Sequence, residues 1–238
     1  MGAAVEPSPA IKAGEMHDLF YQRTRICLWL GVVFFSLFAL LDFICCRPYF
    51  GLFFTYRLVS VLFFLCCLQI LTYPEVKPHA RSIMSAAMLL GALAISLMTV
   101  QLGGYVSDYY VGILLMIAGG FSVLPLNVAQ ALLLGGSTYL VYVLTVYLGT
   151  APLDDRAVVY LVNNSFFFFS IVVVTAVQCF DEMQTHLKSL RAKKNLQAMS
   201  SEFKHYNDNL EELVRLRMAL LSSTAFANSF FNESICAV

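Results

Sequence analysis

Two ionisable side chains lie inside otherwise apolar stretches of this sequence. Asp42 follows FFSLFALL, and Arg57 follows LFFTY. A charge buried in hydrocarbon is costly, so such residues usually pair with one another or line a functional cavity. Two interpretations of these residues remain open. The residues could form a polar lining for a ligand pocket that opens to the outside, or they could be structural, as an ion pair or as an arginine that snorkels to the surface.

Amide side chains offer further polar groups in apolar stretches. Asn163 and Asn164 lie in the last of these stretches, and Asn127 and Gln130 lie near the start of the one before it. Amides of this kind can hydrogen-bond across membrane helices, or they can line a cavity. The candidate site for a ligand or an ion pair therefore comprises Asp42, Arg57, Asn163 and Asn164.

Small residues recur in the same stretches. Glycine pairs occur at 103–104, 119–120 and 135–136, and Ala87 and Gly91 have small-x-x-x-small spacing. Small faces allow membrane helices to approach closely. We expect these residues to serve helix packing.

Residue patterns for catalysis and for metal binding are missing from the sequence. It contains no P-loop, no glycine-rich nucleotide loop, no zinc-protease helix and no G-x-S-x-G. His17, His79, His186 and His205 all lie outside the apolar stretches, so a membrane haem would lack axial ligands. The seven cysteines form no C-x-x-C pair. We therefore predict no catalytic residue, no metal and no cofactor, and the 58 residues after the apolar block are too few and too coil-like for an enzyme core.

Composition points to a membrane protein. Hydrophobic residues make up 59% of the 238 residues, and charged residues 13%, whereas soluble domains carry about 25% charged residues. Only ten charged residues lie in 26–180, while thirteen lie in 181–220. Long apolar runs with few charges are typical of helices that cross a lipid bilayer. The net charge is zero, so no basic excess indicates nucleic acid.

Six transmembrane helices are predicted, and they define an all-α, polytopic membrane protein with a cytoplasmic coiled-coil extension. The tight link at 125–127 predicts an antiparallel hairpin between the fourth and fifth helices. The predicted helices lie at about 26–46, 52–72, 82–102, 109–124, 128–149 and 157–180. The predicted regions are a cytoplasmic segment at 1–24, the membrane domain at 25–180, a signalling helix at 181–220 and a disordered or truncated tail at 221–238.

Lysine and arginine residues near the helix ends predict the orientation. With the N-terminus inside, the inner segments carry most of them, while the outer loops carry only Arg47 and Arg156. An excess of basic residues marks the cytoplasmic side. Both termini are therefore expected in the cytoplasm of a cell whose inner (plasma) membrane holds the protein.

A heptad pattern follows the last apolar stretch without an intervening proline or glycine. From Leu196 the apolar positions advance by alternating steps of three and four, which is typical of a coiled-coil seam, and between Leu190 and Leu196 the phase slips by three residues. Such a seam needs a partner, and the simplest one is a second copy, which predicts a parallel homodimer through 183–220. The predicted seam residues are Leu187, Leu190, Leu196, Met199, Phe203, Tyr206, Leu210 and Leu213.

Several strings resemble a known kind of membrane module. YVSDYYVGILLMIAGGFSVLPLNVAQALLL, LVNNSFFFFSIVVVTAVQ and LKSLRAKKNLQ are similar to parts of the six-helix sensor modules of bacterial sensor histidine kinases and membrane-bound adenylate cyclases. In those kinases the linker coil leads into a segment with a phosphorylated histidine. Here STAFANSFFNES at 223–234 contains no histidine, so no phosphoacceptor is assigned. The resemblance implies a signal input module that transmits through a dimeric coil.

Three functions remain open at this stage. The first is a membrane sensor or signal-transmission module, histidine kinase-like, that passes a signal from the bilayer or the outer face to an output kinase, cyclase or other partner. The second is a structural or accessory subunit of a larger membrane complex, in which the coil would bind a different protein. The third is a small transporter with a cavity lined by the candidate residues.

Overall fold

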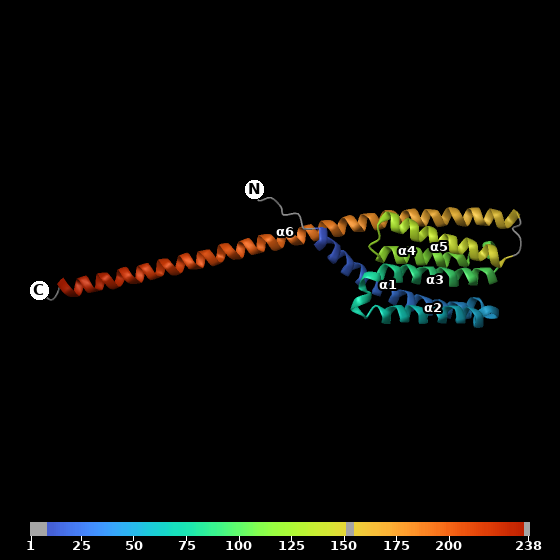
Figure 1. The fold of residues 1–238 in the computed structure, drawn as a ribbon, viewed down its shortest axis with the longest axis horizontal. Coiled ribbons are helices and arrows are strands. Elements are labelled where there is room, and N and C mark those ends of the chain that lie inside the picture. Colours follow the sequence, from blue (N-terminus) through green and yellow to red (C-terminus); the bar gives the residue numbers. More distant parts are fainter. Residues whose placement is uncertain (1–8, 151–154, 236–238) are drawn as a thin grey trace. The chain divides into compact units, whose positions relative to one another are not determined.

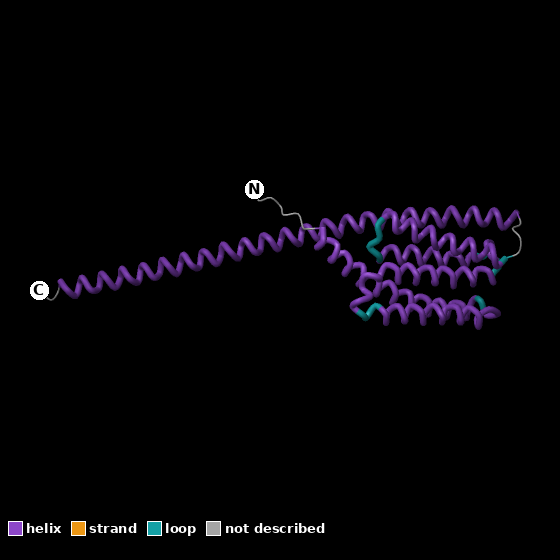
Figure 2. Tube along the Cα trace, viewed as in Figure 1, coloured by secondary structure: helices purple, strands orange, loops and turns teal. Residues whose placement is uncertain are grey.

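The computed structural model describes residues 9–150 and 155–235, and every regular element in these ranges is helical (Figures 1 and 2). The prediction of an all-α fold is confirmed. Short 3₁₀ turns connect the longer helices: η1 (Arg47–Tyr49), η2 (Pro74–His79), η3 (Gly104–Val106) and η4 (Asp108–Tyr110). The α-helices are α1 (Pro9–Cys45), α2 (Phe50–Ile70), α3 (Ala80–Gln101), α4 (Val111–Val123), α5 (Val128–Gly149) and α6 (Asp155–Ile235).

Five helical segments among the described residues are long and apolar enough to cross a membrane. The segment Asp108–Val123 is apolar but shorter. At 1.5 Å per residue it is roughly 24 Å long, against about 30 Å for the hydrocarbon core of a bilayer. The number of spans therefore stays a prediction.

Local signals fix several helix ends. α5 begins after a capping box, in which the Asn127 backbone N–H donates to Gln130 Oε1 at 3.2 Å and the Asn127 side chain accepts from the Gln130 backbone. The side chains of these two residues therefore pair with backbone N–H groups at the start of α5 and do not bridge helices. After α3, Gly103 and Gly104 have φ angles of 103° and 65°, a conformation that glycine adopts without steric cost.

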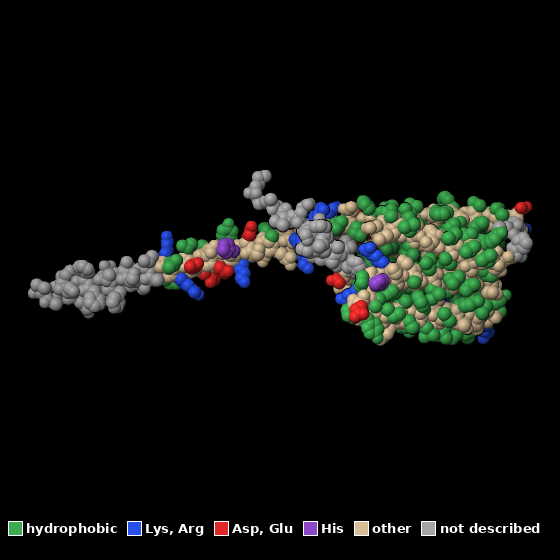
Figure 3. All heavy atoms as spheres, in the orientation of Figure 1, with side chains coloured by type: hydrophobic (Ala, Val, Ile, Leu, Met, Phe, Trp, Pro, Cys, Tyr) green, Lys and Arg blue, Asp and Glu red, His purple; other side chains and the backbone are tan. Residues whose placement is uncertain are grey.

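The chain divides into two compact units, the first ending at Gln184 and the second beginning at Thr185. In the first unit α3 is the central helix. Of its most apolar 18 residues 56% are buried, against 17–33% for the other four long segments. Figure 1 shows α3 between the α1–α2 pair and the helices α4 and α5. Hydrophobic side chains cover most of the visible face of this bundle (Figure 3).

The second unit is the part of α6 that follows Thr185. Helix continues through residues 221–235, where the sequence had suggested disorder or truncation. These residues contain no proline or glycine, so nothing in them breaks the helix. Residues 236–238 and residues 1–8 of the predicted N-terminal segment lie outside the described ranges.

One glycine pair provides a test of how α5 packs against α6. A Cβ atom on Gly135 would lie 2.8 Å from both γ carbons of Val172, whereas a Cβ on the neighbouring Gly136 would meet nothing within 4 Å. We expect Gly135→Ala to lower the free energy of unfolding by about 1–3 kcal/mol through overpacking. Gly136→Ala is the matched control, since it gains the same helix propensity without a clash. Thermal unfolding of the purified variants measures both, and equal shifts would contradict this packing.

Candidate functional site

Asp42 and Arg57 form a buried ion pair. Arg57 Nε donates to Asp42 Oδ2 at 2.5 Å, and Arg57 Nη2 donates to Asp42 Oδ1 at 3.2 Å. Their side chains are only 2% and 5% exposed. Asp42 lies one turn before the end of α1 and Arg57 two turns into α2, so the short connection through η1 brings them to the same depth. A guanidinium and a carboxylate in this two-point geometry stabilise one another's charge where no water is available.

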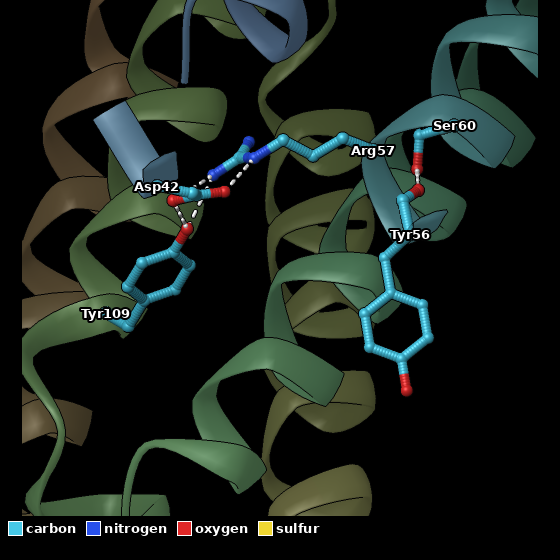
Figure 4. Close-up of polar contacts among 5 residues, drawn as sticks. All are labelled: Asp42, Tyr56, Arg57, Ser60 and Tyr109. Atoms are coloured by element: carbon cyan, nitrogen blue, oxygen red, sulfur yellow. Dashed lines mark hydrogen bonds and ion pairs between the residues drawn. The ribbon is translucent and has the colours of Figure 1, made fainter. Parts of the chain in front are cut away.

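A tyrosine from a third element completes the cluster. The Tyr109 hydroxyl, carried by η4, donates to Asp42 Oδ1 and accepts from Arg57 Nη2 at 2.6 Å (Figure 4). We call Asp42, Arg57 and Tyr109 the polar triad. Sequence analysis missed Tyr109 as a site residue, because a tyrosine at the start of an apolar stretch is also typical of the membrane interface.

Aromatic rings surround the guanidinium. The Arg57 Cζ atom lies 5.8 Å from the ring centre of Phe35 and 5.5 Å from that of Phe38, both on α1. Phe53 packs against Tyr109 with ring centres 5.7 Å apart. Cation–π contacts of this kind stabilise a desolvated arginine. They also fix the plane of the guanidinium, and with it the direction of its remaining donors.

One guanidinium nitrogen has no partner among the described residues. The hydrogen bonds of Arg57 use Nε and Nη2 only. In Figure 4 the remaining nitrogen, Nη1, points away from Asp42 and Tyr109. Two N–H donors on a side chain that is 5% exposed are thus available to a further group.

A cavity of about 390 Å³ adjoins the triad. Its walls come from α1 between residues 27 and 41, from α3 between 84 and 95 and from α4 between 111 and 120, and they are almost entirely apolar. Arg57, Tyr109 and Asp108 are the polar residues at one end. This volume falls within the range of about 300–1,000 Å³ that small-molecule pockets occupy.

The two asparagines lie elsewhere. Asn164 is 3% exposed, and its amide donates to the Tyr105 backbone oxygen at 3.0 Å and to the Tyr142 hydroxyl at 3.4 Å, which joins α6 to η3 and α5. Asn163 is exposed. The structure therefore brings Asp42 and Arg57 together, gives Asn164 a separate structural contact and leaves Asn163 outside both clusters.

Further polar contacts join α6 to the bundle. Arg23 on α1 and Glu182 form an ion pair at 3.5 Å, and Cys179 Sγ donates to the Phe121 backbone oxygen at 3.2 Å. The ion pair is about a third exposed on both sides, so its contribution to stability is small. Together with Asn164, these contacts hold α6 near both ends of its apolar part.

The predicted seam residues lie on the second unit. Leu187 and Leu190 are half-buried, and the six from Leu196 to Leu213 are between 59% and 75% exposed. Within the described part of this unit the apolar row has no partner, and the structure does not test the predicted coiled coil.

Nothing in the described residues forms a metal site, since no group of three or more His, Cys, Asp or Glu side chains converges there. Cys46, next to the triad and outside the apolar segments, is a poor nucleophile. Burial raises the pKa of its thiol, and Asp42 and Cys45 raise the pKa further.

Variants of the triad test its role in stability. We expect Asp42→Asn and Arg57→Gln each to lower the free energy of unfolding by about 3–5 kcal/mol, because each leaves a buried charge unpaired. The double variant should lose clearly less than the sum of the two, since it removes both charges. Tyr109→Phe should cost roughly 1–3 kcal/mol, while Tyr49→Phe, on an exposed tyrosine, should cost almost nothing. Thermal unfolding in detergent checks the series, and additive losses would contradict a coupled triad.

Comparison with known proteins leaves the family open. No family model, curated protein or solved structure matches the chain. The function is therefore argued from the residues and their geometry.

Proposed function

We propose that the chain is a membrane-embedded sensor that passes a signal from the bilayer or the outer face, through a dimeric coiled coil, to an output domain or partner. The output would be a kinase, a cyclase or another protein that reads the arrangement of the coil. One observation carries the proposal: an unpartnered heptad row lies on the same helix as an apolar stretch long enough to cross a membrane.

Helix α6 supplies the physical link. It runs from Asp155 to Ile235, and its helical assignment is unbroken between Gln178 and Thr185, where the apolar stretch ends and the charged stretch begins. A helix transmits a rotation or a shift along its axis because each backbone hydrogen bond couples one turn to the next. A signal that moves the apolar part of α6 would therefore reach the seam.

The exposed seam favours binding of a partner helix. Six apolar side chains at heptad spacing are at least 59% exposed, and full burial of a side chain of this size contributes about 1.5–3 kcal/mol. A helix that presents such a row to water gains from pairing with a second apolar row. The six residues are Leu196, Met199, Phe203, Tyr206, Leu210 and Leu213.

The flanks of the seam suit a second copy of the same chain. With Leu196 and Leu210 at heptad position a, the e and g positions hold mainly uncharged residues, among them Asn195, Ser200 and Asn207. Charged e and g positions usually select a particular partner. Between Leu196 and Leu213 only Glu202 is charged at these positions, so the e and g positions there add no like-charge repulsion against an identical helix.

The proposed membrane arrangement follows the charge distribution. The sensor would cross a bacterial inner membrane six times with both termini in the cytoplasm. The shorter helix α4 would reach across the bilayer together with η4, and the basic residues of η2 and of the second unit would face the cytoplasm.

Cysteine cross-linking tests the dimer. In a cysteine-free background, single cysteines at Leu196, Met199, Phe203 and Leu210 should form disulfide-linked dimers on mild oxidation. Matched cysteines at Ser201 and Asp208, on the outer face of the same helix, should cross-link at least several-fold less. A flat pattern along the coil would overturn the proposal. Native mass spectrometry adds a second readout, and a stoichiometric foreign partner would instead indicate an accessory subunit.

Thiol labelling tests the orientation. In the same background, a cysteine at Arg47 in η1 should react with a membrane-impermeant maleimide in intact cells. A cysteine at His79 in η2 should react only after permeabilisation, because η1 and η2 lie at opposite ends of α2. Both residues are exposed, so accessibility within the protein does not differ. The reverse pattern would show that the orientation is wrong.

A further inference from the structure

The cavity beside the polar triad is larger than ordinary packing defects. Protein interiors have few voids larger than a water molecule. This cavity measures about 390 Å³, and apart from its polar end its lining is apolar. Such an apolar lining favours apolar molecules over water.

Two glycines of α4 contribute to this space. Gly112 and Gly119 line the cavity and have room around them, whereas Gly31 and Gly120, which also line it, already pack closely against Phe64 and Met88. A Cβ on Gly119 would meet nothing within 4 Å, and a Cβ on Gly112 would make only ordinary contact with Ile95. Neither glycine serves a close helix contact of the kind seen at Gly135. The small face of α4 instead leaves room beside α1 and α3.

The cavity opens sideways between α1 and α4. Phe34 and Leu41 on α1 and Val111 and Leu115 on α4 line it, and each is between 47% and 52% exposed on the apolar surface of the bundle. The opening thus lies on the apolar surface of the bundle, which would face the lipid chains of a bilayer. A ligand would enter from the membrane and would itself be largely apolar.

The polar end selects the head of the ligand. Arg57 Nη1 lacks a partner among the described residues, and Arg57 lines the cavity. Asp42 already neutralises Arg57, and Asp108, which also lines the cavity, adds a further carboxylate. An anionic head would meet two carboxylates against one guanidinium. A neutral hydrogen-bond acceptor can use the Nη1 donors without that repulsion.

We propose that this cavity binds a neutral amphiphile from the bilayer, with its apolar body between α1, α3 and α4 and one carbonyl oxygen accepting from Arg57 Nη1. Ordinary phospholipids fit less well, because the phosphate is anionic. The idea that this ligand is the stimulus of the sensor rests on the proposed function. The idea that the cavity binds it does not. Bound at the triad, it would touch the elements that Asp42, Arg57 and Tyr109 join.

Photolabelling of the full chain in phosphatidylcholine nanodiscs tests the binding. The probe is 2-tridecanone with a diazirine in its chain, compared with the carboxylic acid, the primary amine and the alkane of equal length. The ketone should label α1 and α4 about tenfold more than the alkane, which lacks the acceptor, and more than the acid or the amine. Preferential labelling by the acid or the amine, or equal labelling by all four, would overturn the inference.

Two glycine variants locate the site. Gly119→Phe should fill the cavity and remove the labelling. Gly136→Phe is the matched control, because this glycine also has open space around it but does not line the cavity. If Gly119→Phe keeps an unchanged unfolding temperature and still labels fully, the ligand does not bind here and the inference is wrong.

The two proposals fail in different ways. Ketone labelling at α1 and α4 together with a flat cross-linking pattern along the seam would remove the sensor and leave the ligand site. A period-3.5 cross-linking pattern without ketone labelling would remove the ligand site and leave the sensor. A ketone-dependent change in the seam cross-links would support both.

Discussion

A hydrocarbon environment offers no hydrogen-bond partner to a polar group, and the helical bundle reflects this constraint at every level. Its backbone groups are paired within helices. Serine and threonine hydroxyls such as those of Ser96 and Thr99 donate to carbonyls one turn back in their own helix. Among the described residues, the buried acid Asp42 and the buried base Arg57 pair with each other and with Tyr109. Two groups depart from this pattern among the described residues: the buried hydroxyl of Thr24 has no partner, and neither has Nη1 of Arg57.

The polar triad joins the α1–α2 hairpin to the start of α4. Asp42 and Arg57 lie on consecutive helices, so their contact stabilises a hairpin that the short turn already favours. Tyr109 comes from much later in the chain, and its hydroxyl brings η4 and the start of α4 to the same place. Gly112 and Gly119 on α4 leave room for the cavity beside this junction. The ligand proposed above would bind where this charge cluster adjoins the cavity.

The second unit follows the opposite rule. Its polar and charged side chains are mostly exposed, and within the described part of this unit the apolar row from Leu196 to Leu213 has no partner. In the bundle the cost of burying polar groups decides the contacts, whereas the second unit exposes an apolar row that pairing with another helix would bury. One helix, α6, contains both regimes. This explains why a greasy segment continues into a charged one with no turn between them.

The sequence by itself determined the elements. Apolar runs, proline and glycine positions and heptad spacing predicted the helices, with α5 at the predicted residues and α6 continuing past the apolar stretch, because these signals act within a few turns of the chain. It also suggested the Asp42–Arg57 pair, whose members are near neighbours across one turn. Only the tertiary structure decided that Tyr109 joins them, that Asn164 contacts Tyr105 and Tyr142, that α3 is central and that a cavity remains beside α4. Those features depend on how each helix is rotated toward its neighbours, and that rotation is set by side-chain packing between segments far apart in the chain.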